Sequence, residues 1–243
     1  QTRAKIKEKF VKNNNYKPLD IMTLIPARGL SIDSTSNHLD KLSDKCIINW
    51  TIDSAINSQY CKNIIVSTPD PQIKDHVDKS YNMNELKTIN RDPELARLNV
   101  GIEGTVEDAL SYYENCFPRP DAILILYDEY PFKKSWQIDE VIHTMQIFNV
   151  DVVDGIKPDN RFYYKHDGGG LKPTVDYGGL QLERDQLYRR VGGVHLIKTD
   201  FFLKNKKMID GKIGHIHFDQ LTAFQIKSKL DLEIAQFLAS KVI

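Results

Sequence analysis

The chain has 243 residues, which is enough for one large domain or two small ones with a substantial buried core. Hydrophobic residues make up 41% and charged residues 27%, as is usual for a globular protein in water. Lys+Arg and Asp+Glu each number 33, so the formal net charge is zero, which argues against a nucleic-acid binder because such proteins usually have an excess of basic residues.

Membrane and secretory signals are absent from the sequence. No run of about 18 apolar residues occurs, so we expect no membrane span, and the first residues lack the apolar segment of a signal peptide. Cys46, Cys61 and Cys116 are widely spaced without a CxxC motif, which favours a reduced compartment and predicts a cytoplasmic protein. The chain begins at Gln1 rather than Met, which is typical of a trimmed chain or a piece of a longer polypeptide.

Residues 1–18 are interpreted as a basic N-terminal extension. One hypothesis is a solvated helix or a frayed tail before the domain, and the other is a phosphate-binding arm. Its basic residues are Arg3, Lys5, Lys7, Lys9, Lys12 and Lys17.

Predicted strands recur along the rest of the chain. The first is the apolar run Ile21–Ile25, which ends at Pro26 and suits a strand buried on both faces of a parallel sheet. Similar runs predict strands over 63–67, 86–89, 122–126, 151–156 and 194–197.

Predicted helices lie between these strands. Ile48, Ile52 and Ala55 recur at helical spacing, and Pro71 suits the first turn of a short helix. Thr105 and Asp108 resemble an N-terminal capping pair for a helix over 105–114. Another helix begins at Ser135, and the last covers 228–240. In the last helix we expect a buried face made of Leu230, Ile234, Phe237 and Leu238.

Alternating strands and helices predict an α/β fold, with a mostly parallel twisted sheet and helices on both faces, in a single domain over 19–243. Residues 157–190 differ, because they contain Gly168–Gly170 and several tyrosines, and we interpret them as an excursion of hairpins and loops. Ligands of such sheets bind at the carboxyl ends of strands, which directs attention to the loops after Ile25, Val66 and Leu126.

The first of these loops reads Pro26-Ala27-Arg28-Gly29-Leu30-Ser31. Arg28 supplies positive charge, and Gly29 would let the backbone amides approach an anion, so the loop suits a phosphate cradle. A structural turn would explain the same residues.

This loop resembles the opening motif of the acylneuraminate (CMP-sialic acid) cytidylyltransferases and, more distantly, of the CMP-Kdo synthetases. The resemblance continues through Lys45 to Ala55, 64–68, 122–133, 190–194 and 223–235. It implies a nucleotide-diphospho-sugar transferase-like, Rossmann-like fold and a nucleotidyltransferase that joins an acidic, sialic acid-like sugar to CMP from CTP, with release of pyrophosphate. It also implies Mg²⁺ and a homodimer in which the excursion over 157–190 is the dimerisation arm, with a lid as the alternative.

The positions that match the family's site give the candidate residues, whether or not the family's residue type is kept. We predict Arg28, Lys133 and Asp128 as catalytic residues. The predicted nucleotide-binding residues are Ala27, Arg28, Gly29, Ser31 and Glu103, and the predicted substrate-binding residues are Tyr127, Glu129, Lys133, Gln225 and Lys227.

Three departures from the family pattern concern charge. The glycine- and lysine-rich loop has Ile32 where the family has lysine, and His38 where it has asparagine. Asp128 and Glu129 replace neutral residues and are the remaining candidates for a metal site. The family's metal-binding aspartate pair is Gln225 and Lys227 here, so Lys227 could place an ammonium where a metal would lie.

These departures leave three hypotheses open. The chain is an active cytidylyltransferase, or a degenerate member that binds nucleotide or sugar or partners an active enzyme, or a transferase rebuilt around Asp33, Asp128 and Glu129. Outside these loops, the default interpretations are a helix cap for Asp231, a surface pair for His215 and His217, and a satisfied sheet residue for His195.

Overall fold

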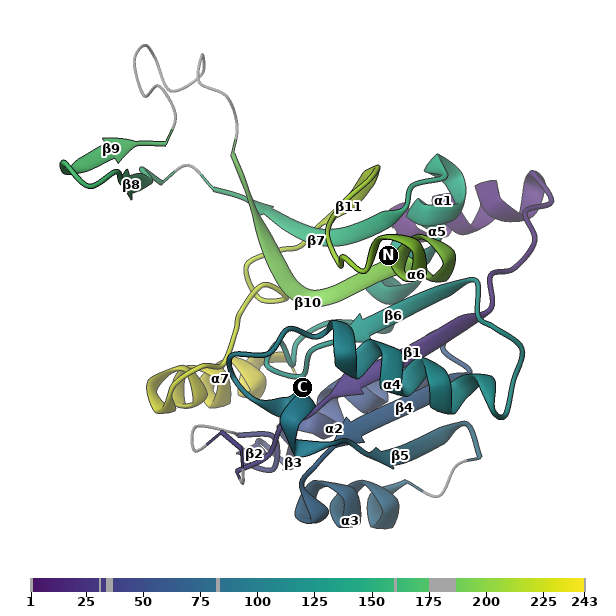
Figure 1. Ribbon diagram of the computed structural model, residues 1–243, viewed down its shortest axis with the longest axis horizontal. Coiled ribbons are helices and arrows are strands. Elements are labelled where there is room, and N and C mark those ends of the chain that lie inside the picture. The colour runs from purple at the N-terminus through teal and green to yellow at the C-terminus, as the bar shows by residue number, and fades with distance from the viewer. Residues whose placement is uncertain are drawn as a thin grey trace.

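A computed structural model of the chain describes residues 2–30, 32–33, 37–81, 84–159, 161–174 and 187–242. Its centre is a seven-stranded sheet in the order β11-β7-β10-β6-β1-β4-β5 (Figure 1). Of these strands only β10 runs antiparallel to its neighbours, so the predicted mostly parallel sheet is confirmed. The strands are β1 (Ile21–Pro26), β4 (Asn63–Thr68), β5 (Leu86–Asn90), β6 (Ala122–Leu126), β7 (Val152–Pro158), β10 (Tyr188–Lys198) and β11 (Ile213–His217).

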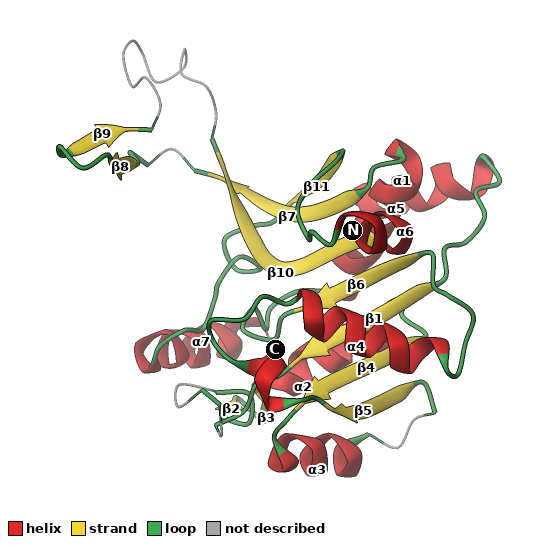
Figure 2. Ribbon diagram, in the orientation of Figure 1, coloured by secondary structure: helices red, strands yellow, loops and turns green. Residues whose placement is uncertain are grey.

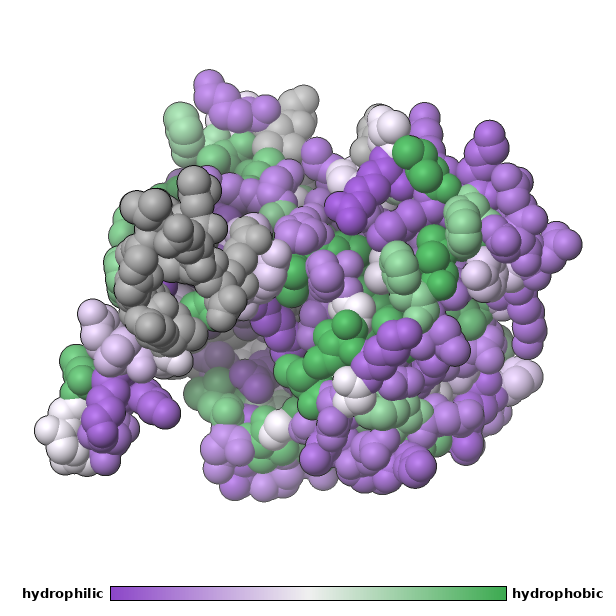
Figure 3. Space-filling model, turned by 90° about the horizontal axis from the view of Figure 1, so that it is seen from above, coloured by the Kyte–Doolittle hydropathy of each residue, from purple (hydrophilic) through white to green (hydrophobic). Residues whose placement is uncertain are grey.

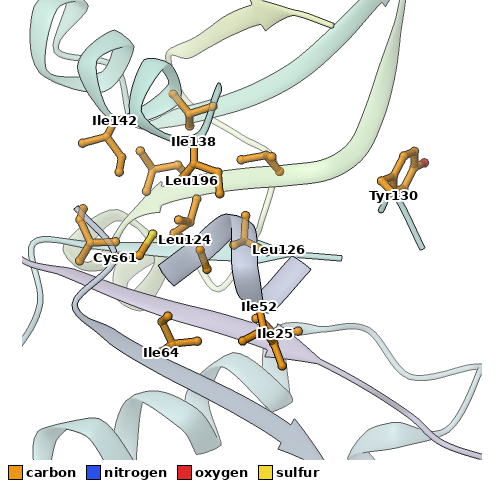
Figure 4. Packing of buried hydrophobic residues seen from close by; sticks show 14 of the residues in the cluster. Ile25, Ile52, Cys61, Ile64, Leu124, Leu126, Tyr130, Ile138, Ile142 and Leu196 are labelled. Atoms are coloured by element: carbon orange, nitrogen blue, oxygen red, sulfur yellow. The ribbon is translucent and has the colours of Figure 1, made fainter. Parts of the chain in front are cut away.

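Helices cover both faces of the sheet (Figure 2). One face packs against α2 (Ile47–Ile56), α3 (Pro71–Ser80) and α5 (Ser135–Phe148), and the other against α4 (Glu103–Glu114) and α6 (Thr199–Asn205). Strand β1 shows the reason, because its side chains alternate between the two clusters: Ile25 belongs to the first and Leu24 to the second. Figure 4 shows the first cluster, in which Ile52 lies beside Ile25.

Helix α1 (Thr2–Asn13) packs along α5. Ala4 and Val11 are buried, and Arg3 and Lys7 both reach the carboxylate of Glu140. The basic extension is therefore an attached helix, and it lies away from the carboxyl ends of the central strands (Figure 1). None of the described helices is both long enough and apolar enough to cross a membrane. Seen from above, the surface is largely hydrophilic with separate hydrophobic patches (Figure 3).

The excursion contains a hairpin, as predicted. Strands β8 (Tyr164–His166) and β9 (Leu171–Pro173) pair antiparallel and project from the body of the molecule (Figure 1). Phe162 and Leu171 are exposed, although both are large and apolar. Residues 160 and 175–186 of the predicted arm lie outside the described residues.

Two predictions about helices were wrong in detail. Helix α4 begins at Glu103, not Thr105, and no side chain caps its first turn. In α7 (Lys229–Val242), Leu230, Ile234 and Phe237 are 64%, 41% and 64% exposed. The small Ala235 and Ala239 are buried there instead, in a minor cluster with Leu42, Ile47, Phe132 and Ile226.

Four short elements were not predicted. They are β2 (Lys41–Leu42), β3 (Lys45–Cys46), the 3₁₀ turn η1 (Pro93–Ala96) and α6, and they lie between the longer elements.

Candidate functional site

A cavity of about 350 Å³ opens where β1, β5 and β6 end at their carboxyl edges. Its wall is strongly polar and contains charges of both signs. The cationic residues are Arg28, Arg91 and Lys227, the carboxylates are Asp33, Asp128 and Glu129, and the remaining residues are Pro26, Asn37, His38, Ile102, Tyr127 and Ile226. The loops after Ile25 and Leu126 therefore converge as expected, whereas the loop after Val66 contributes no residue to this wall and Arg91 comes from the loop after β5.

Gly29 fixes the shape of the loop after β1. Its φ of +79° is unfavourable for other residues, and a Cβ there would lie 2.2 Å from Asp70 Oδ2. The same carboxylate accepts a hydrogen bond from Leu30 N at 3.1 Å and, through Oδ1, caps α3 at Gln72 N. Gly29 thus faces Asp70 rather than the cavity, which supports the structural-turn interpretation of this glycine. Ser31 lies outside the described residues.

The side chain of Arg91 contacts the loop after β1 and is 1% exposed. Its Nη2 donates to the carbonyl of Ala27 at 3.1 Å, its Nη1 approaches Thr105 Oγ1 at 3.5 Å, and its Nε has no acceptor among the described residues. Burial, with the nearby charge of Arg28, lowers the pKa of Arg91 to about 10, so the guanidinium stays charged at neutral pH. A buried cation without a carboxylate is costly unless a ligand supplies negative charge.

Arg91 was not predicted as a site residue, although its place in the sequence indicates one. It directly follows the predicted strand 86–89, and the carboxyl ends of parallel strands meet at one edge of the sheet. Arg28 faces the same cavity, and in the described part of the chain neither arginine forms an ion pair. The two guanidinium groups therefore suit an anionic ligand.

His38 and Asp128 are joined across the cavity. His38 Nδ1 donates to Asp128 Oδ2, and His38 Nε2 accepts a hydrogen bond from Arg28 N at 3.2 Å. Both side chains are buried. This arrangement links the loop after β1 to the loop after β6 and leaves the lone pair of the imidazole on Nε2.

Lys133 does not have the role that the resemblance implies. Its ammonium is buried and donates to Thr51 Oγ1 at 2.6 Å, Tyr127 O at 2.9 Å and Tyr130 O at 2.6 Å, so all three N–H groups are used within the protein. Burial lowers the pKa of Lys133 to about 7, against the opposing charges of Asp128 and Glu129. We correct the expectation that Lys133 contacts the acceptor: it holds the loop over 127–133 in place.

The two carboxylates named as metal candidates both have partners within the protein. Asp128 is engaged by His38, and Glu129 Oε2 accepts a hydrogen bond from Gln225 Nε2 at 2.6 Å. Nowhere in the described ranges do three His, Cys, Asp or Glu side chains come together in a group that could hold a metal ion. Since Mg²⁺ is commonly bound through one or two carboxylates together with substrate phosphates, Asp128 and Glu129 stay candidate ligands at the cavity.

Lys227 is fixed at the cavity wall through its neighbours. The Ile226 amide donates to Glu129 O at 2.8 Å, the Ile226 side chain is buried, and the Lys227 amide donates to Asp231 Oδ2 at 3.1 Å. Asp231 also accepts from Ser228 N and Oγ, so the helix-cap interpretation of Asp231 is confirmed.

Of the remaining expected site residues, one lines the cavity and the others do not. Tyr127 lines it, and burial raises the pKa of its hydroxyl. Ala27 contributes its carbonyl to Arg91, whereas Glu103 and Gln225 stand outside the described wall.

Three histidines of β10 and β11 are not among the residues that line the cavity. His195 Nδ1 lies 2.7 Å from Asp154 Oδ1, but its Nε2 has no partner among the described residues, so only one of its nitrogens is satisfied. His215 and His217 are exposed on β11 with ring centroids 5.4 Å apart, which confirms the surface pair.

The sheet and its polar cavity define an α/β protein of the nucleotide-diphospho-sugar transferase type. Residues 22–150, more than half of the chain, match the family model described as Cytidylyltransferase. The chain belongs to the cytidylyltransferase family, and the resemblance identified in the sequence is confirmed at that level.

Similar sequences cover most of the chain. It is 25% identical over 225 residues to "Post-translational flagellin modification protein B" of Campylobacter coli, covering 90% of this chain and 94% of that protein. It is 26% identical over 192 residues to "CMP-N,N'-diacetyllegionaminic acid synthase" of Legionella pneumophila, covering 76% and 81%.

Solved structures support the fold. A 4-diphosphocytidyl-2C-methyl-D-erythritol synthase from Anaerococcus prevotii matches with a TM-score of 0.69 at 12% identity, covering 92% of this chain and 97% of that one. A CMP:2-keto-3-deoxy-manno-octonic acid synthetase complexed with CTP matches with a TM-score of 0.66 at 11% identity, covering 92% and 100%.

Proposed function

We propose that this protein transfers the cytidylyl group of CTP to an acidic sugar of the sialic acid class, giving the CMP-sugar and pyrophosphate. The observation that supports this proposal most directly is Arg91, a buried cation without a carboxylate partner in the described structure, at the wall of the cavity. The names of two similar sequences, both CMP-N,N'-diacetyllegionaminic acid synthases, support an acidic sugar of this kind as the acceptor.

In this proposal, different residues of the cavity wall bind the triphosphate and the acceptor sugar. Arg28 and Arg91 bind phosphate oxygens from the loops after β1 and β5, where a planar guanidinium can donate two hydrogen bonds to an oxyanion. Lys227 approaches from the loop before α7 and offsets further negative charge on the triphosphate or the acceptor. Tyr127 and Glu129 line the part of the cavity beside Lys227 and would contact the acceptor.

A second candidate function is nucleotide binding without turnover. Lys227 favours it, because an ammonium lies at a wall position where the family resemblance implies a metal-binding carboxylate. An active member would bind Mg²⁺ through the phosphates of CTP together with Asp128 or Glu129.

We also propose a homodimer that forms through the β8–β9 hairpin. Phe162, Tyr164 and Leu171 expose apolar surface on a projecting element, as interface residues do in a free protomer. A lid that closes over the cavity of the same protomer is the alternative. The free thiols of Cys46, Cys61 and Cys116 support a reduced compartment such as the cytoplasm.

Arg91→Met tests the nucleotide site. CTP, with ATP, GTP and UTP as controls, is titrated calorimetrically in Mg²⁺ and in EDTA, and pyrophosphate release is assayed with N-acetylneuraminic acid, N,N'-diacetyllegionaminic acid and Kdo. The variant should lose about tenfold or more in CTP affinity, because a charged hydrogen-bond donor is removed from the phosphates.

Arg119→Met is the matched control, since Arg119 is exposed and paired with Glu114 on the surface. Equal CTP affinity in the Arg91 variant and this control would contradict the proposed phosphate site.

A further inference from the structure

His38 and Asp128 form the one carboxylate–imidazole pair in the described wall of the cavity. Asp128 is 2% exposed and His38 is 8% exposed, so water competes little for either partner. The His38 carbonyl also accepts a hydrogen bond from Ile48 N at 3.0 Å, which ties the residue to the first turn of α2. The imidazole is therefore held at both its backbone and its ring.

The orientation of the ring is informative. The carboxylate takes the Nδ1 proton, so the free lone pair is on Nε2, and Nε2 points to the amide of Arg28. That amide belongs to the loop proposed to bind phosphate. Nε2 of His38 therefore accepts the hydrogen bond of the Arg28 amide. An anionic oxygen of a bound phosphate could accept the same hydrogen bond instead.

The proposed reaction requires a base in this region. When the acceptor hydroxyl attacks the α-phosphorus, its proton must be transferred, and an efficient general base has a pKa near the working pH. Arg28 and Arg91 are not bases at neutral pH, and Glu129 is engaged by Gln225.

We propose that His38 is the general base for the acceptor hydroxyl and that Asp128 orients the imidazole and stabilises its charged form. This inference rests on the proposed function. Phosphate binding gives the Arg28 amide a charged acceptor in place of Nε2, because hydrogen bonds to ionised oxygens are the stronger ones. The lone pair of Nε2 is then available to the acceptor.

In the proposed step, a proton is transferred to His38 as one bond to phosphorus forms and another breaks. Nε2 takes the proton of the hydroxyl, the hydroxyl oxygen forms a bond to the α-phosphorus, and the bond from that phosphorus to the β-phosphate oxygen breaks. Pyrophosphate leaves with the electron pair, and the imidazolium later returns its proton to solvent. Asp128 remains a carboxylate throughout.

The surrounding charges support this role. Burial, the largest influence, lowers the pKa of His38, but Asp128 and, more weakly, Glu129 outweigh it and raise the pKa above its ordinary value, while Arg91 acts in the opposite direction. Turnover should therefore fall as the pH drops and the imidazole becomes protonated before substrate binds.

His38→Gln is the decisive variant. A glutamine amide can donate to Asp128 and accept from Arg28 N, so it can keep the link between the two loops, but it cannot take a proton. We expect kcat for pyrophosphate release to fall about 10²–10⁴-fold, while CTP affinity measured by calorimetry stays within about threefold of the wild type. His38→Ala should lower both kcat and CTP affinity, and His217→Gln, at an exposed residue of β11, should change neither.

Asp128→Asn supplies a second measurement. It should lower kcat about 10²-fold or more and remove stabilisation of the imidazolium, which lowers the acidic pKa of the kcat/KM profile. The acidic limb of that profile should disappear in His38→Gln.

Other outcomes separate this inference from the proposed function. If His38→Gln keeps wild-type kcat, or loses kcat only in proportion to CTP affinity, the base role is wrong and His38 is a positioning residue. If the wild type neither binds CTP nor releases pyrophosphate, the proposed function fails, and this inference fails with it.

Discussion

Lys133 shows how far a single residue can depart from the role its position implies. Its ammonium has three protein acceptors, one of them the carbonyl of the wall residue Tyr127, and Lys133 itself is not among the residues that line the cavity. It closes the loop that presents Asp128 and Glu129, so its effect on the site is indirect. The sequence could identify the positive charge at this position, but not its burial.

Lys133→Ala should destabilise the fold by about 3 kcal/mol, because Tyr130 O and Thr51 Oγ1 would lose the donor that Lys133 supplies and Tyr127 O would keep only the amide of Tyr130. Urea unfolding of the variant measures this loss. Lys62→Ala, at an exposed lysine, is the control and should stay within about 0.5 kcal/mol of the wild type. An equally small change for Lys133→Ala would show that the loop does not depend on its ammonium.

Other site residues could be predicted only in part. Arg28 and Tyr127 follow directly from the loops after the first and fourth predicted strands, and both line the cavity. The pairing of His38 with Asp128 could not be predicted, because the two residues are 90 positions apart in the chain and meet only when the loops fold together. The contact of Gly29 with Asp70 has the same origin.

At the scale of elements, α5 illustrates how a buried polar face joins the layers. Tyr60 and His143 Nε2 are 2.7 Å apart, and Ser58 Oγ donates to Asp139 Oδ1 at 2.6 Å. These contacts connect the turn after α2 to α5. Periodicity predicted the apolar side of α5 but could not predict that its polar residues would also be buried.

His143 predicts a pH dependence of stability. Burial lowers its pKa to about 4 from an ordinary value of 6.5, so between these values the unfolded chain binds a proton that the folded chain does not. The free energy of unfolding should therefore fall as the pH drops through this window, by up to about 1.4 kcal/mol per pH unit from this group. Urea unfolding at several pH values measures the slope.

His143→Gln should flatten the slope by about one proton, because glutamine does not titrate. His217→Gln serves as the control and should leave it unchanged. A slope in His143→Gln as steep as in the wild type would assign the acid sensitivity to other groups.

The longest elements were the most predictable. Strands β1 and β6 are continuous apolar runs, since each is buried on both faces of the sheet. The predicted buried face of helix α7 was wrong at Leu230, Ile234 and Phe237 but right at Leu238, because the helix covers only the minor cluster, where two alanines and the partly buried Leu238 suffice. Apolar spacing alone cannot tell which of two stripes a peripheral helix buries.

At the scale of the whole molecule, the projecting hairpin predicts the oligomeric state. Phe162→Ser with Leu171→Ser should convert a dimer into a monomer in light scattering, because both side chains are exposed in the free protomer. Phe148→Ser, at another exposed phenylalanine, is the control and should remain dimeric. A monomeric wild type would contradict the dimer and favour the lid.

The whole molecule is otherwise a sheet whose carboxyl edge places cations, carboxylates and an imidazole around one cavity. The class of fold could be predicted because alternation of strands and helices permits few arrangements. The balance of charges in the cavity could not, since it depends on which loop residues turn inward.

In the proposed function, this cavity binds CTP and transfers its cytidylyl group to an acidic sugar. The most direct measurement is pyrophosphate release from CTP in the presence of N,N'-diacetyllegionaminic acid, with CTP binding followed calorimetrically in the same samples. We predict selective CTP binding, pyrophosphate release that requires the sugar, and in Arg91→Met a loss of about tenfold or more in CTP affinity together with slower release. CTP binding without release in a panel of acidic sugars would leave a nucleotide-binding protein, and no binding of any nucleotide would contradict the account.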